Sequence, residues 1–192
     1  MTAWSRSDDG APERVPTPAL GDADGWRAFS AGIAARVGTR DPLEILAATA
    51  PRLEALLRGR SLAELQRPEA PGRWSVAAVI EHLADAELVF GFRVRQVLTQ
   101  EAPPLASFDQ EGWATVGRYA EGEAHLALAL FAALRARHLA LYARLTAADW
   151  ERVGMHGDRG EESLRTMVRI IAGHDLAHCA QVERILGVPT DA

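Results

Sequence analysis

Residues 163–187, SLRTMVRIIAGHDLAHCAQVERILG, are the stretch that decides the fold. Ser163 is a good helix N-cap, and Gly187 is a typical residue just past a helix end. Between these two residues, one set recurs at alternating three- and four-residue steps: Leu164, Met167, Ile171, His174, His178, Gln181 and Ile185. This spacing predicts the core-facing side of a bundle helix, with histidines where two leucines would be expected.

These histidines are the first candidates for a metal site. His174 and His178 are one helical turn apart, so both imidazoles project from the same face, as in helical zinc clamps. His82 interrupts a second apolar stripe on the helix predicted over 76–98. Three imidazoles with an open coordination position are typical of a catalytic site for one divalent metal ion. From spacing alone, three buried core histidines remain an equal alternative.

Other residues are candidates to support this site. A ligating imidazole usually donates its second N–H to a carboxylate or carbonyl, which makes Asp85 and Asp175 candidate partners. His138 lies on a third apolar stripe. It is a candidate hydrogen-bond partner of a ligating imidazole, with a fourth metal ligand or a plain core residue as the alternatives. Cys179 is expected to be a buried thiol, with a thiolate ligand as the alternative. The two remaining histidines, His125 and His156, are expected to be solvated.

Outward from this stretch, the sequence predicts an all-α fold, a four-helix bundle. Strand signals are almost missing, and a long connection lies between the second and third helices. Asp41 and Pro42 start the first helix, which Pro51 should interrupt, and Ser61 with Glu64 forms a capping box. The main helices are predicted over 42–58, 76–98, 123–145 and 164–186, with a short one at 62–66 and loops at 100–122 and 154–160.

Composition limits the other possibilities. The chain has 192 residues, of which 48% are hydrophobic, and fits one domain plus a flexible N-terminal tail over 1–25. We expect no membrane span, because no apolar stretch approaches the ~18–20 residues that a span needs. We also expect no nucleic-acid partner, because the net charge is −5 and arginine is dispersed. A single cysteine fits a cytoplasmic protein. The absence of lysine excludes Schiff-base catalysis.

Four segments resemble the DinB-like family. Gly72-Arg73-Trp74-Ser75-Val76 leading into Glu81-His82-Leu83-Ala84-Asp85 is similar to the start of its second helix. His174-Asp175-Leu176-Ala177-His178, followed by Gln181, is similar to its fourth-helix signature. Residues 108–113 resemble its crossover loop, and residues 150–160 its approach to the last helix.

The resemblance covers residues 41–187 and implies several properties. It implies a bundle in up-down-down-up order and homodimers. It also implies one divalent metal, zinc or nickel with iron as the alternative, bound by His82, His174 and His178. Characterised members include thiol-dependent transferases and isomerases that use mycothiol or bacillithiol. This sequence departs from the family pattern at Ala177 and Cys179, which would reshape the pocket without removing a ligand.

The expected function is a metal-dependent enzyme that acts on a small molecule. It would be an S-transferase using a low-molecular-weight thiol, or a hydrolase. The alternative is a metal-binding stress-response protein without turnover. An arginine such as Arg93 or Arg118 is a candidate to bind a substrate carboxylate.

Overall fold

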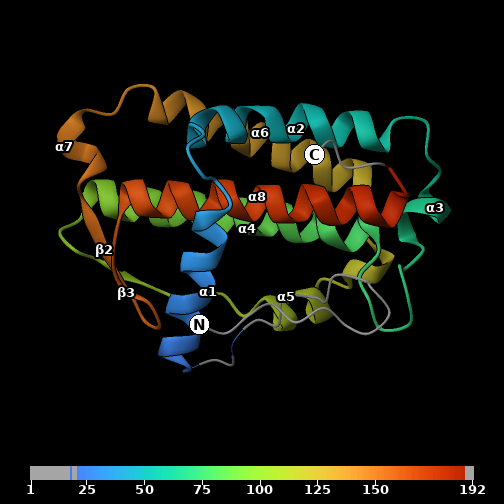
Figure 1. The fold of residues 1–192 in the computed structure, drawn as a ribbon, viewed down its shortest axis with the longest axis horizontal. Coiled ribbons are helices and arrows are strands. Elements are labelled where there is room, and N and C mark those ends of the chain that lie inside the picture. Colours follow the sequence, from blue (N-terminus) through green and yellow to red (C-terminus); the bar gives the residue numbers. More distant parts are fainter. Residues whose placement is uncertain (1–17, 19–20, 189–192) are drawn as a thin grey trace.

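Four long helices form the bundle in a computed structural model that describes residue 18 and residues 21–188. They are α2 (Pro42–Leu57), α4 (Val76–Thr99), α6 (Ala124–Tyr142) and α8 (Leu164–Leu186). Helices α2 and α8 run in one direction and α4 and α6 in the other (Figure 1). The expected all-α bundle with up-down-down-up order is therefore confirmed.

Local capping signals set where most of these helices begin. The side chains of Asp41, Ser75 and Ser163 each accept a hydrogen bond from a backbone N–H in the first turn of α2, α4 and α8. The expected capping box of Ser61 starts the short helix α3 (Leu62–Gln66). The interruption predicted at Pro51 is wrong, because α2 continues through this residue, which lies on the exposed side of the helix.

A buried polar layer divides the core of the bundle into two apolar clusters. Arg135 of α6 donates hydrogen bonds to Glu87 of α4 and Asp175 of α8, and Thr49 of α2 donates to Asp175 at 2.8 Å. The layer is completed by His138, whose Nδ1 lies 2.7 Å from Glu87 Oε1. Since buried charges are costly unless they are paired, this layer fixes how the four helices align.

The long crossover between α4 and α6 is more ordered than predicted. It contains β1 (Pro104–Leu105), α5 (Gln110–Val116) and the 3₁₀ turn η1 (Tyr119–Glu121). The loop predicted at 154–160 is instead a hairpin of β2 (Val153–His156) and β3 (Gly160–Ser163), which follows α7 (Ala147–Trp150). β1 pairs with β2 in parallel, with Leu105 opposite His156. This pairing is between distant segments, so local sequence signals could not predict it.

One helix, α1 (Ala23–Ala35), precedes the bundle and was not predicted. It begins within the segment expected to be a flexible tail, most of which lies outside the described residues. It crosses α8 on the side of the bundle away from α2 (Figure 1). At the crossing, a Cβ on Gly173 of α8 would lie 2.0 Å from the carbonyl oxygen of Ile33, so α1 can approach α8 closely only because residue 173 is glycine.

Helix α6 departs from the expectation that no stretch could span a membrane. It is the one helix in the described part of the chain that is long and apolar enough, with a mean hydropathy of 1.3 over its best 18-residue window, a third of it buried. Core helices of water-soluble proteins also meet this criterion. Here Arg135 and His138 of α6 are buried against Glu87 inside the bundle, which is not a lipid-facing arrangement.

Candidate metal centre

Three histidines from two helices meet between α4 and α8. The Nε2 atoms of His82 and His174 are 3.0 Å apart. The ring of His178 lies 4.9 Å from that of His82 and 4.4 Å from that of His174, centroid to centroid. If one ring nitrogen is taken from each of the three histidines, these three atoms all lie within 4.8 Å of one another. The structure thus brings together the three residues that the sequence selected as metal ligands.

The imidazoles are in the chemical form that a metal requires. Burial lowers the pKa of His178 to about 4, and burial together with the other two histidines lowers the pKa of His174 well below its usual range. Both rings are therefore neutral at pH 7, as ligation demands. His178 Nδ1 lies 2.8 Å from Gln181 Oε1, so Nδ1 carries the proton and Nε2 presents its lone pair to the cluster.

Aromatic rings cover the cluster on the side of His82. Phe108, from the crossover, stacks on His82 with its ring plane tilted by only 7°, and Trp74 packs against the same imidazole at 5.1 Å between centroids. Trp113 of α5 in turn meets Phe108 edge to face. The crossover therefore restricts access of water to the histidines from this direction.

The predicted hydrogen-bond partners of the imidazoles are placed elsewhere. Asp175 points into the polar layer, where Arg135 and Thr49 occupy its oxygens. Asp85 accepts a hydrogen bond from the hydroxyl of Tyr119. These placements, with His138 bonded to Glu87, do not support the predicted role.

For Asp175, the reason is the helical geometry. A residue next to a ligand, such as Asp175 beside His174, is turned by about 100° around the helix axis. The partner found by the structure is Gln181, three residues after His178 and on the same face. In the sequence, Gln181 lies on the apolar stripe of residues 163–187, and no local signal marks it as a partner of His178.

The fit to a divalent metal follows from the donor set. Two facing ring nitrogens can share one proton, but the Nε2 lone pair of His178 in the same cluster would then stay unsatisfied. A single cation satisfies all three nitrogens, and three imidazoles are a common ligand set for zinc and related ions. Within the described residues, His174 Nδ1 is buried and has no hydrogen-bond partner.

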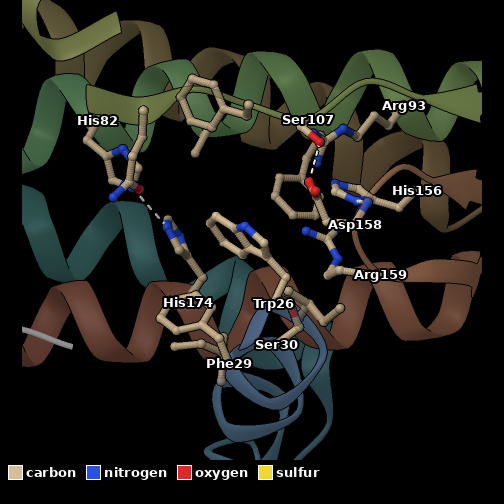
Figure 2. A pocket seen from close by; sticks show the side chains of 16 residues that line it. Trp26, Phe29, Ser30, His82, Arg93, Ser107, His156, Asp158, Arg159 and His174 are labelled. Atoms are coloured by element: carbon tan, nitrogen blue, oxygen red, sulfur yellow. Dashed lines mark hydrogen bonds between the residues drawn. The ribbon is translucent and has the colours of Figure 1, made fainter. Parts of the chain in front are cut away.

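A pocket extends from this cluster along α4, and Figure 2 shows its lining side chains. It encloses about 660 Å³ of empty space, part of which is open to solvent. His82 and His174 line one end, and Arg93, His156, Asp158 and Arg159 line the other (Figure 2). Most other lining side chains are apolar, namely Trp26, Phe29, Ile33, Ala86, Phe90, Phe108 and Ile170.

The remaining candidate residues divide between the pocket and the surface. Arg93 lines the pocket, whereas Arg118 lies on the surface in an ion pair with Glu121. His156, expected to be solvated, is buried because β2 carries it against the pocket, while His125 is exposed as expected. Cys179 is buried in the apolar core, and burial raises its pKa to about 12, so it remains a protonated thiol.

Comparisons with known proteins agree with this architecture. The chain is 32% identical over 121 residues to a candidate metal-dependent hydrolase of Bacillus licheniformis, covering 62% of this chain and 69% of that protein. It is 32% identical over 131 residues to one from Geobacillus kaustophilus, covering 68% and 74%. The solved structure of YfiT from Bacillus subtilis, described as a probable metal-dependent hydrolase with an unusual four-helix bundle topology, matches with a TM-score of 0.69 and 24% identity over 77% of this chain and 87% of YfiT.

The match to a protein family covers most of the bundle. The sequence pattern of the DinB superfamily matches residues 45–182, a range that includes His82, His174 and His178 and leaves out α1. The chain therefore belongs to the DinB superfamily.

Proposed function

We propose that this protein is a metal-dependent hydrolase that acts on a small molecule. The observation that carries the proposal is the convergence of His82, His174 and His178, two of which line one end of a mostly apolar pocket. The relatives described as candidate metal-dependent hydrolases support the reaction class.

The protein's own side chains would supply binding, orientation and exclusion of water. A divalent metal in a three-histidine site with an open position acts as a Lewis acid and lowers the pKa of water toward neutrality. His82, His174 and His178 would hold it, with Gln181 fixing the ring of His178. Phe108 and Trp74 shield the site and thereby strengthen electrostatic interactions within it.

The test begins with the metal. Protein purified without an immobilised-metal column should contain close to one equivalent of a divalent metal, measured by mass spectrometry. A panel of small esters and amides should then reveal turnover that disappears on chelation and returns when the metal is restored.

A pair of variants separates the site from nonspecific effects. His178→Ala should lose both the metal and turnover, whereas His125→Ala, which changes an exposed histidine of α6, should retain both. Metal content far below one equivalent, without uptake on titration, would overturn the proposal.

Two further outcomes would redirect the assignment. Turnover that needs a low-molecular-weight thiol would identify an S-transferase in place of a hydrolase. Full metal loading without turnover of any substrate class, with or without thiols, would identify a metal-binding protein without catalytic activity.

A further inference from the structure

The pocket end opposite the histidines holds an arginine without a charged partner. Arg93 of α4 is only 3% exposed. Its Nη2 donates a hydrogen bond to the carbonyl of Ala106, and its guanidinium lies over the ring of Phe90, 5.4 Å from the centroid. Among the described residues, no carboxylate forms an ion pair with Arg93, and its buried Nε has no hydrogen-bond partner. Buried charges in proteins are normally paired, so this one calls for an anion.

The nearby carboxylates of Glu162 and Asp158 form hydrogen bonds with groups other than Arg93. Glu162 binds Arg159 through both of its oxygens. Asp158 accepts hydrogen bonds from the hydroxyl of Ser107 and the backbone N–H of Gly21. The positive charge of Arg93 is therefore not neutralised by an ion pair. Burial, followed by the charge of Arg159, lowers the pKa of Arg93 to about 10, which still leaves it protonated at pH 7.

His156 adds a second donor at the same end. It is 4% exposed, and its Nδ1 accepts a hydrogen bond from the backbone N–H of Asp158 at 3.2 Å. Burial, together with the charges of Arg159 and Arg93, lowers the pKa of His156 to about 4, so the ring is neutral at pH 7. With Nδ1 as the acceptor, Nε2 carries the hydrogen, and this buried N–H has no partner in the described part of the chain.

Both unsatisfied groups are donors, which defines the ligand. The N–H groups of Arg93 and His156 can be satisfied only by an acceptor, and the charge of Arg93, on which Glu162 acts without forming an ion pair, favours a negative one. A planar carboxylate matches the fork of a guanidinium. We propose that this end of the pocket binds the carboxylate of the substrate through Arg93 and His156.

The rest of the pocket then describes the substrate class. The pocket is also lined by the side chains of Trp26 and Phe29 from α1, with Trp26 between the two ends (Figure 2). Phe108 from the crossover stacks on His82 at one end, and Phe90 from α4 lies under Arg93 at the other. A substrate whose carboxylate binds Arg93 would place its apolar or aromatic part along these rings. Its reactive group would then lie near the histidines. The inference rests on the proposed function, since it takes this pocket as the substrate site.

The experiment measures binding to the metal-free protein, because carboxylates also bind metals directly. Calorimetric titrations would compare benzoate, phenylacetate and hexanoate with the corresponding neutral amides in a low-chloride buffer. We expect at least one acid to bind about tenfold or more tightly than its amide, a difference that an ion pair with a buried guanidinium provides.

Two arginine variants locate the interaction. Arg93→Met keeps the length of the side chain and removes its charge, so the preference for the acid should disappear. Arg118→Met, which changes an exposed arginine of the crossover, should keep the preference unchanged. Thermal unfolding of each variant would verify that it is folded.

Three results would overturn the proposal. These are equal affinities for acid and amide, an acid preference that persists in Arg93→Met, and no saturable binding of any acid at millimolar concentration. The comparison of acid with amide in the wild-type protein decides the question even if Arg93→Met does not fold. Because this test uses no metal and no turnover, its failure is distinguishable from failure of the proposed hydrolase.

Discussion

At the scale of single residues, Gln181 orients one metal ligand. Its Oε1 accepts the Nδ1–H of His178 and thereby fixes both the tautomer and the direction of Nε2. Removal of such a partner typically lowers metal affinity about 10- to 100-fold. We therefore expect Gln181→Leu to weaken metal binding by that factor, measured by competition with a chelator, while the helical circular dichroism stays unchanged.

The control for this substitution is Gln96→Leu. Gln96 lies on the same helix as His82 but about 20 Å farther along its axis. Its replacement should leave metal affinity as it is. Equal affinities of the wild type and Gln181→Leu would show that the ring of His178 is held by packing alone.

His156 predicts how stability depends on pH. Burial is the main reason that its pKa falls to about 4, compared with 6.5 in an unfolded chain. Below pH 6.5 the unfolded chain therefore binds a proton that the native protein does not, so the free energy of unfolding falls as the pH is lowered from about 6.5 to about 4.

Chemical denaturation of the metal-free protein at several pH values would measure this loss. The variant His156→Gln has no titrating ring and should show a shallower fall, whereas His125→Ala should follow the wild type. An identical pH profile for His156→Gln and the wild type would contradict the assigned pKa.

At the scale of elements, Gly173 determines whether α1 can cover the pocket. A Cβ at this position would meet the carbonyl oxygen of Ile33 at 2.0 Å, and neither helix backbone can yield cheaply. We expect Gly173→Ala to displace α1 and with it the pocket wall formed by Trp26 and Phe29. Hydrogen exchange should then accelerate over residues 23–35 and change little in α2, α4 and α6.

Gly32→Ala is the matched control with the opposite sign. Gly32 lies within α1, and a Cβ there would meet no atom within 4 Å. Alanine is favoured over glycine inside a helix by about 1 kcal/mol, so exchange in α1 should slow down. Unchanged exchange of α1 in Gly173→Ala would show that the crossing tolerates a methyl group.

The elements that the sequence predicted well are those specified by local signals. Caps such as Ser75 and Ser163 and the stop at Gly187 located α4 and α8 to within a residue or two. Helix α1 was missed because it follows a tail-like segment and contains two glycines, although Trp26, Phe29 and Ile33 have helical spacing. The β2–β3 hairpin was missed because its pairing with β1 depends on the distant crossover.

The candidate site, like the helices, was predictable only where local sequence signals specify it. His82, His174 and His178 could be selected because imidazoles stand out on apolar stripes. The polar layer around Arg135 was not predicted, since its members are ordinary helix residues in the sequence and meet only when four helices pack. The same holds for His156, which local composition places in a solvated loop and β2 carries into the pocket.

At the scale of the whole molecule, apolar side chains remain on the outer surface of the packed pair α4 and α6. Phe92 is 63% exposed and Leu126 is 70% exposed, with Leu88 and Leu130 each at 49%. Leu88 and Phe92 belong to α4, and Leu126 and Leu130 belong to α6. Because the family resemblance implies homodimers, we propose that a second copy of the chain covers this surface.

A charged residue in this surface tests the proposed dimer. We expect the wild-type protein to sediment as a dimer and Phe92→Glu, alone or with Leu130→Glu, to sediment as a monomer of 20.8 kDa, since a carboxylate buried in an apolar interface is strongly unfavourable. Val116→Glu, a change in an exposed valine of α5 in the crossover, should leave the dimer intact. A monomeric wild type would show that no second copy covers this surface. A dimer that persists in the double variant would show that the two copies pair through another surface. In either case, the exposed apolar side chains would need a different partner.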